Sequence, residues 1–201
     1  MTRGALRGKR FGVRTEQTLS LLETPRLRLL SLSLEIVEAV IEGRRDDAEA
    51  LVGARMPERW PNREIVERAF SASLHEIRED PARCLWGDRV LLAREKDDDW
   101  RVVGSVIFHG KPADDGIAEI AYGVEESSQG RGFATEAVAA CVTWALEQPD
   151  VRAVQAATFG WHRASLRVIE KVGMSQVGVR DHETMGQLLV FEQRRFEQRG
   201  L

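Results

Sequence analysis

The sequence predicts a mixed α/β domain whose sheet is largely antiparallel. Three observations predict it: apolar runs of strand length, stretches in which apolar residues recur every three or four positions, and a strand followed at once by a glycine-containing loop and a helix. Of the 201 residues, 43% are hydrophobic and 30% are charged, as in folded globular proteins. No repeat or Pro/Gly/Ser-rich linker divides the chain, so we expect one domain.

The first predicted elements are a strand and two helices. Polar and apolar residues alternate over 26–32, which is typical of a strand with one face in water. Apolar residues recur with helical spacing over 34–41, and Gly43 is the expected end of that helix. A second helix is predicted to begin near Asn62, a suitable N-cap, because apolar residues recur every three or four positions over 65–74. Both apolar faces are expected to pack on the core.

A hairpin and a third strand follow along the chain. Residues 89–94 and 100–108 are apolar and β-branched, and the charged segment 95–99 between them predicts a turn. Residues 111–116 contain Pro, Asp and Gly and predict another turn. Residues 117–124 are therefore expected to be the third strand of an antiparallel meander.

The charge of the chain is divided unevenly. Five of the 29 basic residues precede the first acidic residue, Glu16, so 24 basic residues face 32 acidic ones in the remainder, a formal charge of −8. An acidic body argues against a nucleic-acid-binding face and suits a cationic acceptor. We expect residues 1–22 to be a disordered extension or the result of an upstream start codon, with a basic interaction arm as the alternative. Residues 23–195 would then be the domain and 196–201 a tail.

Three classes of protein are excluded by composition. No run approaches the roughly 18 apolar residues of a membrane-spanning helix. Cys84 and Cys141 are too few for a disulfide framework and lack a Cys/His cluster for structural zinc, which indicates a reducing, cytoplasmic setting with inert thiols. The three aspartates at 97–99 lack the alternation and glycine of a calcium loop, so no metal is expected.

The most informative segment is the glycine-containing loop at 129–134, followed at once by a helical run at 135–148. Glycines allow a sharp turn and a close approach of the backbone to a ligand, and the first N–H groups of the helix point outward with the positive end of its dipole. This arrangement predicts a pyrophosphate-binding site. Two rival loops fit poorly, because a P-loop requires a lysine before Thr135 and a dinucleotide-binding loop requires glycine or alanine where Thr135 stands.

At these residues the chain resembles the GNAT superfamily of acyl-coenzyme A-dependent N-acetyltransferases. The loop fits every fixed position of the family motif Gln/Arg-x-x-Gly-x-Gly/Ala, and it reads Gln129-Gly130-Arg131-Gly132-Phe133-Ala134. The flanking segments 118–124, 134–137 and 165–174 are similar to the RimJ/RimL-like branch, which contains the ribosomal-protein N-terminal acetyltransferases. The resemblance covers 24–194. It implies a twisted, mostly antiparallel sheet, a splayed parallel pair formed by 117–124 and 153–159, and helices on both faces.

The resemblance also implies which residues contact acetyl-coenzyme A. In the family, the loop binds the pyrophosphate and the pantetheine lies between the splayed strands. Carried over to this sequence, the coenzyme contacts are Tyr122, Gly123, Val124, Gln129, Gly130, Arg131, Gly132, Phe133, Ala134, Thr135, His162 and Ser165. Family members often have asparagine where this chain has His162, so that contact departs from the pattern.

The resemblance suggests two residues for the chemistry. Glu119 is similar to the strand glutamate that serves as the general base in several members, and Ser165 would donate a proton to the leaving thiolate. Other roles stay open: Glu119 as a salt-bridged strand residue, Ser165 as the N-cap of a helix over 166–172, and Tyr122 as a core aromatic. Trp161 is either a wall of the acceptor site or simple packing, and His109 is expected at the surface.

The implied activity is transfer of an acetyl group from acetyl-coenzyme A to a primary amine by direct attack in a ternary complex, without a metal. The acceptor would be a small-molecule or peptide amine: a protein N-terminus, a polyamine, an amino acid or an aminoglycoside. The partners expected are this acceptor and a second copy in a homodimer, with neither nucleic acid nor membrane. A non-catalytic acyl-coenzyme A-binding sensor or partner module is the alternative.

Overall fold

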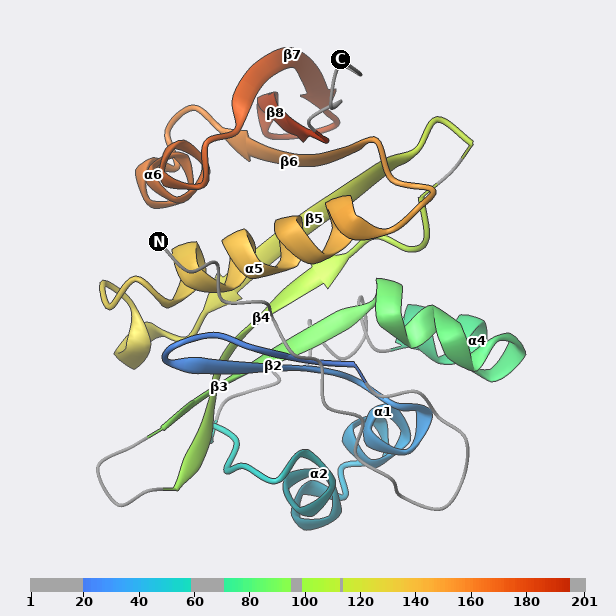
Figure 1. The fold of residues 1–201 in the computed structure, drawn as a ribbon. Coiled ribbons are helices and arrows are strands. Elements are labelled where there is room, and N and C mark those ends of the chain that lie inside the picture. The colour runs from blue at the N-terminus through green and yellow to red at the C-terminus, as the bar shows by residue number, and fades with distance from the viewer. Residues whose placement is uncertain (1–19, 59–70, 95–98, 113, 196–201) are drawn as a thin grey trace, which may run out of the picture.

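The computed structural model describes residues 20–58, 71–94, 99–112 and 114–195, which form one eight-stranded sheet with helices on both faces (Figure 1). The strand order is β1-β2-β3-β4-β5-β6-β8-β7, and every neighbouring pair is antiparallel except β5 and β6. The strands are β1 (Leu21–Glu23), β2 (Leu27–Ser31), β3 (Asp88–Arg94), β4 (Trp100–Phe108), β5 (Ile117–Val124), β6 (Ala153–Phe159), β7 (Ser175–His182) and β8 (Gly186–Arg194). The helices are α1 (Leu34–Ile41), α2 (Arg45–Val52), α4 (Ser71–Glu79), α5 (Phe133–Glu147) and α6 (Arg163–Val172), with the 3-10 helices η2 (Pro81–Trp86) and η3 (Glu126–Ser128). The expected fold class is confirmed.

The sheet separates two hydrophobic cores because successive strand residues point to opposite faces. On β3, Leu91 packs in the core beneath α5, whereas Val90 and Leu92 pack in the core beneath α1, α2 and α4. The buried stripe of α5 beyond its first turn consists of Ala137, Val138, Cys141, Val142 and Ala145. Each fully buried large aliphatic side chain contributes roughly 1.5–3 kcal/mol, so both faces stabilise the sheet.

Several predicted elements are confirmed, and others differ. The first helix ends just before Gly43, whose positive φ of 72° suits glycine. The hairpin β3–β4 and the third meander strand β5 are also found, although residues 95–98 of the turn lie outside the described residues. The predicted helix start at Asn62 also lies outside them, and α4 contains the end of that apolar stripe.

Helix α2 and strand β7 are among the elements that were not predicted. Only Ala48 and Val52 of α2 are buried, so its apolar periodicity is weak. Strand β7 is an edge strand with an almost fully exposed side-chain pattern, so it lacks the alternation that indicates a strand. In both cases the element is fixed by its tertiary neighbours rather than by its own pattern.

The described residues begin at Ser20, before the expected end of the extension at residue 22. Strand β1 pairs with β2, and the Ser20 backbone N–H donates to the Ser31 hydroxyl (3.0 Å). The fully buried Arg89 donates to the Ser20 hydroxyl (3.2 Å) and stacks on Trp144, 4.2 Å from the ring centroid. Residues 1–19 and 196–201 lie outside the described residues. No described helix is both long and apolar enough to cross a membrane.

The parallel strands β5 and β6 splay apart, as expected. Their register runs from Ile117–Ala153 to Ile120–Ala156 and ends there. Beyond that point, residues 121–124 of β5 remain paired with β4, and residues 157–159 of β6 remain paired with β8. The separation leaves the facing backbone edges of the two strands without each other as partners, in the manner of an opened sheet.

Gly104 allows β4 to lie against β5 beside this opening. A Cβ atom at Gly104 would lie 2.2 Å from the Gly123 carbonyl oxygen and 2.9 Å from Val124 Cα. The register of β3 and β4 shifts at this place, since Leu91 faces Gly104 and Leu92 faces Val102. A bulge and a glycine therefore shape β4 beside the opening between β5 and β6.

Candidate active site

The glycine-containing loop forms a turn at the cleft end of β5. Gly130 and Gly132 have φ values of 73° and 82°, which disfavour any side chain, and Gly132 is the N-cap of α5. The first helical hydrogen bond runs from the Glu136 N–H to the Gly132 carbonyl (3.1 Å). The earlier N–H groups of this 15-residue helix thus lack intrahelical acceptors and can bind an anion. We call residues 129–134 the cradle.

Side chains fix the cradle to the end of β5. The Gln129 side-chain amide donates to the Val124 carbonyl (3.0 Å). The Glu125 carboxylate accepts from the Ser128 hydroxyl (2.8 Å) and the Ser127 N–H (3.2 Å), and it thereby caps η3. The cradle is therefore held at the mouth of the opening between β5 and β6.

Arg26 contacts the cradle and was not among the site residues expected from the sequence. Its guanidinium donates to the Arg131 carbonyl (2.8 Å) and to Glu136 (2.7 Å), and it lies over the Phe133 ring, 5.2 Å from the centroid. Glu136 also accepts from the Thr24 hydroxyl (2.6 Å) and from the Arg26 N–H (2.9 Å). Arg26 lies 105 residues before Arg131, so no local pattern links the two.

Glu136 thus joins the first turn of α5 to the segment before β2. The Arg26 side chain remains 50% exposed, and its Nη2 lies 3.3 Å from where a Cβ of Gly132 would be. A half-exposed cation beside outward-pointing N–H groups adds positive charge to an anion site. Arg131 adds a second cation, with its guanidinium 4.5 Å from the Phe133 centroid.

Tyr122 and Ser165 connect β5 to α6. The Tyr122 hydroxyl lies 2.8 Å from the Ser165 hydroxyl and donates to the Ser165 carbonyl (3.1 Å). Ser165 is the third residue of α6 rather than its N-cap, so that expectation is wrong; the cap is His162, whose side chain makes no capping hydrogen bond. Instead, His162 Nδ1 lies 3.4 Å from the Thr158 hydroxyl. Burial raises the pKa of the Tyr122 hydroxyl, which therefore keeps its proton at neutral pH.

Glu119 lies on the opposite face of β5 from Tyr122 and forms an ion pair. Arg180 on β7 donates to both carboxylate oxygens, from Nη2 to Oε1 (2.6 Å) and from Nη1 to Oε2 (3.2 Å). These hydrogen bonds lower the pKa of the Glu119 carboxyl. The alternative of a salt-bridged strand residue is thus what the structure shows, and the Glu119 side chain is 30% exposed.

Aromatic side chains continue from this ion pair along β6 and β7. Phe159 stacks on Trp161, with centroids 5.1 Å apart and planes at 7°, and it meets the His182 ring edge-on at 5.6 Å. Trp161 is 65% exposed, so one of its faces is open to a partner. We call Phe159, Trp161 and His182 the aromatic strip. His109 is exposed, and its backbone N–H donates to the Glu119 backbone carbonyl (3.0 Å).

The two cysteines are free and buried. Burial raises the pKa of Cys141 to about 12, so this thiol is not a nucleophile at neutral pH. Burial also raises the pKa of the Cys84 thiol. Among the residues that the structure describes, no group of three or more His, Cys, Asp or Glu is arranged to hold a metal ion.

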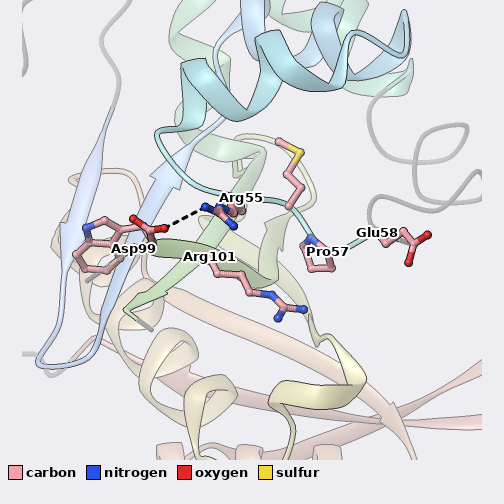
Figure 2. Close-up of a pocket in the computed structure, with 7 residues that line it drawn as sticks. Arg55, Pro57, Glu58, Asp99 and Arg101 are labelled. Atoms are coloured by element: carbon pink, nitrogen blue, oxygen red, sulfur yellow. Dashed lines mark ion pairs between the residues drawn. The ribbon is translucent and has the colours of Figure 1, made fainter. Parts of the chain in front are cut away.

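A separate hollow of about 350 Å³ lies between the segment after α2 and the start of β4 (Figure 2). Its walls are Arg55, Met56, Pro57, Glu58, Asp99, Trp100 and Arg101. Figure 2 shows the ion pair between Arg55 and Asp99 (3.3 Å). Arg101 also pairs with Glu125 (3.4 Å), so the hollow adjoins the segment that leads to the cradle. It contains none of the residues expected to contact the coenzyme.

Comparison with known proteins gives the family. A family model described as an acetyltransferase (GNAT) domain matches residues 26–175. YjdG of Bacillus subtilis (strain 168), an uncharacterized N-acetyltransferase, is 27% identical over 155 residues, which are 76% of this chain and 88% of YjdG.

Two solved structures have the same fold. Ribosomal-protein-S5-alanine acetyltransferase from Vibrio fischeri has a TM-score of 0.62 and 12% identity, over 87% of this chain and 96% of that chain. RimL, a ribosomal L7/L12 α-N-protein acetyltransferase in complex with coenzyme A, has a TM-score of 0.57 and 15% identity, over 85% of this chain and 95% of that chain. The chain therefore belongs to the GNAT acetyltransferase family and is an acyltransferase.

Proposed function

We propose that the protein transfers the acetyl group of acetyl-coenzyme A to a primary amine in a ternary complex. The observation that carries this proposal is the cradle at the mouth of the opening between β5 and β6. Outward N–H groups at the start of α5 suit a pyrophosphate, and splayed strand edges suit the amides of pantetheine. The similar fold of RimL, which was solved with coenzyme A, supports the same donor.

The donor would be bound by residues on both walls of the opening. The cradle and Thr135 would bind the pyrophosphate, together with the cation of Arg26. Gly123 and Val124 would present backbone to the pantetheine, and a Cβ at Gly123 would meet no atom within 4 Å, so the strand is open there. His162, which begins α6, would contact the coenzyme where relatives often have asparagine.

The chemistry would proceed by direct attack. The neutral amine nitrogen attacks the thioester carbon, the carbon–sulfur bond breaks, and an amide and coenzyme A form. Glu119 would take the proton that the ammonium group loses, and the Tyr122–Ser165 hydroxyl pair would give a proton to the thiolate. The second proton, which the nitrogen loses as the amide forms, would return through water to the hydroxyl pair. Because Tyr122 keeps its proton at neutral pH, the pair can act as the donor.

Calorimetry with acetyl-coenzyme A, followed by measurement of coenzyme A release with a panel of primary amines, tests this proposal. We expect micromolar binding and amine-dependent release. Tight binding with no release for any amine would instead favour the coenzyme-binding sensor. Absence of binding would overturn the proposed function altogether.

A further inference from the structure

Arg180 and Glu119 belong to different parts of the sheet. They are 61 residues apart, and β6 and β8 lie between their strands in the sheet order. Figure 1 shows β7 as a strongly curved strand next to β8. The contact between Arg180 and Glu119 thus joins β7 to the far side of the β5–β6 opening.

Both oxygens of Glu119 are occupied by this one guanidinium. In the same row of the sheet, Gln155 on β6 lies between Glu119 on β5 and a second carboxylate, Glu192 on β8. Glu192 is only 6% exposed and accepts hydrogen bonds from Gln155 (2.7 Å) and Arg194 (2.5 Å). Glu119 is therefore the more open carboxylate of this row, and Arg180 is the cation that an incoming ammonium group must replace.

The free-energy cost of displacing Arg180 from Glu119 depends on the charges that the acceptor carries. A purely cationic acceptor would pair with Glu119 and leave the half-exposed Arg180 with water in place of its bidentate carboxylate partner. An acceptor that also carries an anion would keep both charges paired. On this basis, and resting on the proposed function of Glu119, we propose that the acceptor is a zwitterionic amine whose carboxylate binds Arg180.

The aromatic strip indicates what else the acceptor carries. Phe159 and Arg180 both face Leu188, one from β6 and the other from β7, so they flank it in one row of the sheet. His182 lies two positions from Arg180 on the same face of β7, and its ring meets Phe159 edge-on at 5.6 Å, so the aromatic strip begins beside Arg180. The open face of Trp161 continues the strip. The acceptor is therefore an aromatic amino acid or a molecule of that shape and charge.

The test compares L-phenylalanine with L-phenylalaninamide, which keeps the amine and the ring but lacks the carboxylate. The readout is the ratio of kcat/KM for the acid to kcat/KM for the amide, in the wild-type protein and in Arg180→Gln. Comparing the ratio between proteins cancels the different basicity of the two amines. We expect the ratio to fall at least tenfold in Arg180→Gln, mostly through KM, and to be partly retained in Arg180→Lys.

Arg78→Gln is the matched control, because the ion pair of Arg78 with Glu38 resembles that of Arg180 with Glu119. The N–O distance is 2.7 Å in the control pair, with side-chain exposures of 55% and 29%. The distance is 2.6 Å in the Arg180–Glu119 pair, with exposures of 52% and 30%. This variant should keep the wild-type ratio. Equal ratios in wild type and Arg180→Gln, with the amide acetylated by both, would overturn the zwitterion proposal and leave the proposed function intact. If neither amine, nor any other in the panel, released coenzyme A, the proposed function would fail and this inference with it.

Discussion

The two sides of the cleft are built in different ways. The proposed pyrophosphate site on the donor side is a run of consecutive residues, 129–134, whose backbone conformation is set by Gly130 and Gly132. The proposed acceptor side consists of side chains from β5, β6 and β7, and two of its members, Glu119 and Arg180, are 61 residues apart in the chain. A backbone site can be encoded by a short motif, whereas a side-chain site exists only once the sheet has formed.

The largest expected effect is on the acceptor side, in Glu119→Gln. The substitution keeps the shape of the side chain and removes its proton affinity, so turnover should fall by roughly 10²–10⁴. Acetyl-coenzyme A affinity should stay nearly unchanged, because Glu119 lies apart from the cradle. Higher pH should partly restore the rate, since more of the acceptor amine is then neutral. Turnover against pH and calorimetry measure these effects.

Glu38→Gln serves as the control for that substitution, because Glu38 forms a similar ion pair on α1. Its turnover should equal that of the wild type. Equal rates for Glu119→Gln and wild type at neutral pH would remove Glu119 from the mechanism and leave water or an acceptor group as the base.

The next largest effect is on the donor side, in Gly132→Glu. The new side chain would be strained at a φ of 82°, would contact Arg26 at 3.3 Å, and would bring a negative charge toward the phosphates. Acetyl-coenzyme A affinity should fall by about a hundredfold or more. Gly43→Glu introduces the same residue at a φ of 72°, far from the cleft, and should bind normally. If Gly132→Glu bound the donor as tightly as wild type, residues 129–134 would not be the phosphate site.

A smaller loss of donor affinity is expected for Arg26→Gln, about tenfold. The variant loses a cation beside the cradle and the hydrogen bond to the Arg131 carbonyl. Arg28→Gln is its control, because Arg28 instead pairs with Glu23 and stacks on Trp100. Calorimetry at two salt concentrations would show a weaker salt dependence in Arg26→Gln alone; an unchanged affinity would make Arg26 a purely structural residue.

The smallest effect is expected on removing residues 1–19. Ser20, which forms hydrogen bonds with Arg89 and Ser31, remains in this variant. The melting temperature should therefore change by less than about 2 °C, and donor binding should persist. Removing residues 1–23 also deletes β1 and Ser20, and should lower the melting temperature by about 5 °C or more. A large loss already on removing 1–19 would show that this segment stabilises the fold.

The sequence by itself determined the fold class and the candidate donor site. Strand alternation, helical periodicity and the spacing of glycines are local properties, so the meander, α1, α5 and the loop at 129–134 could be predicted from short windows. The splaying of β5 from β6 was expected only through the family resemblance, because no window contains both strands. Their register, and its end at Ile120, come from the structure alone.

Only the tertiary structure decided which distant side chains meet. Nothing local indicates that Arg26 lies against the cradle, that Arg180 occupies Glu119, or that Ser165 pairs with Tyr122. Helix α2 and edge strand β7 were not predicted, because they bury too little apolar surface to show a periodic pattern in the sequence. Backbone conformation depends on neighbouring residues in the chain, whereas charge pairing depends on residues that are neighbours in space. Such spatial contacts form only when the sheet assembles.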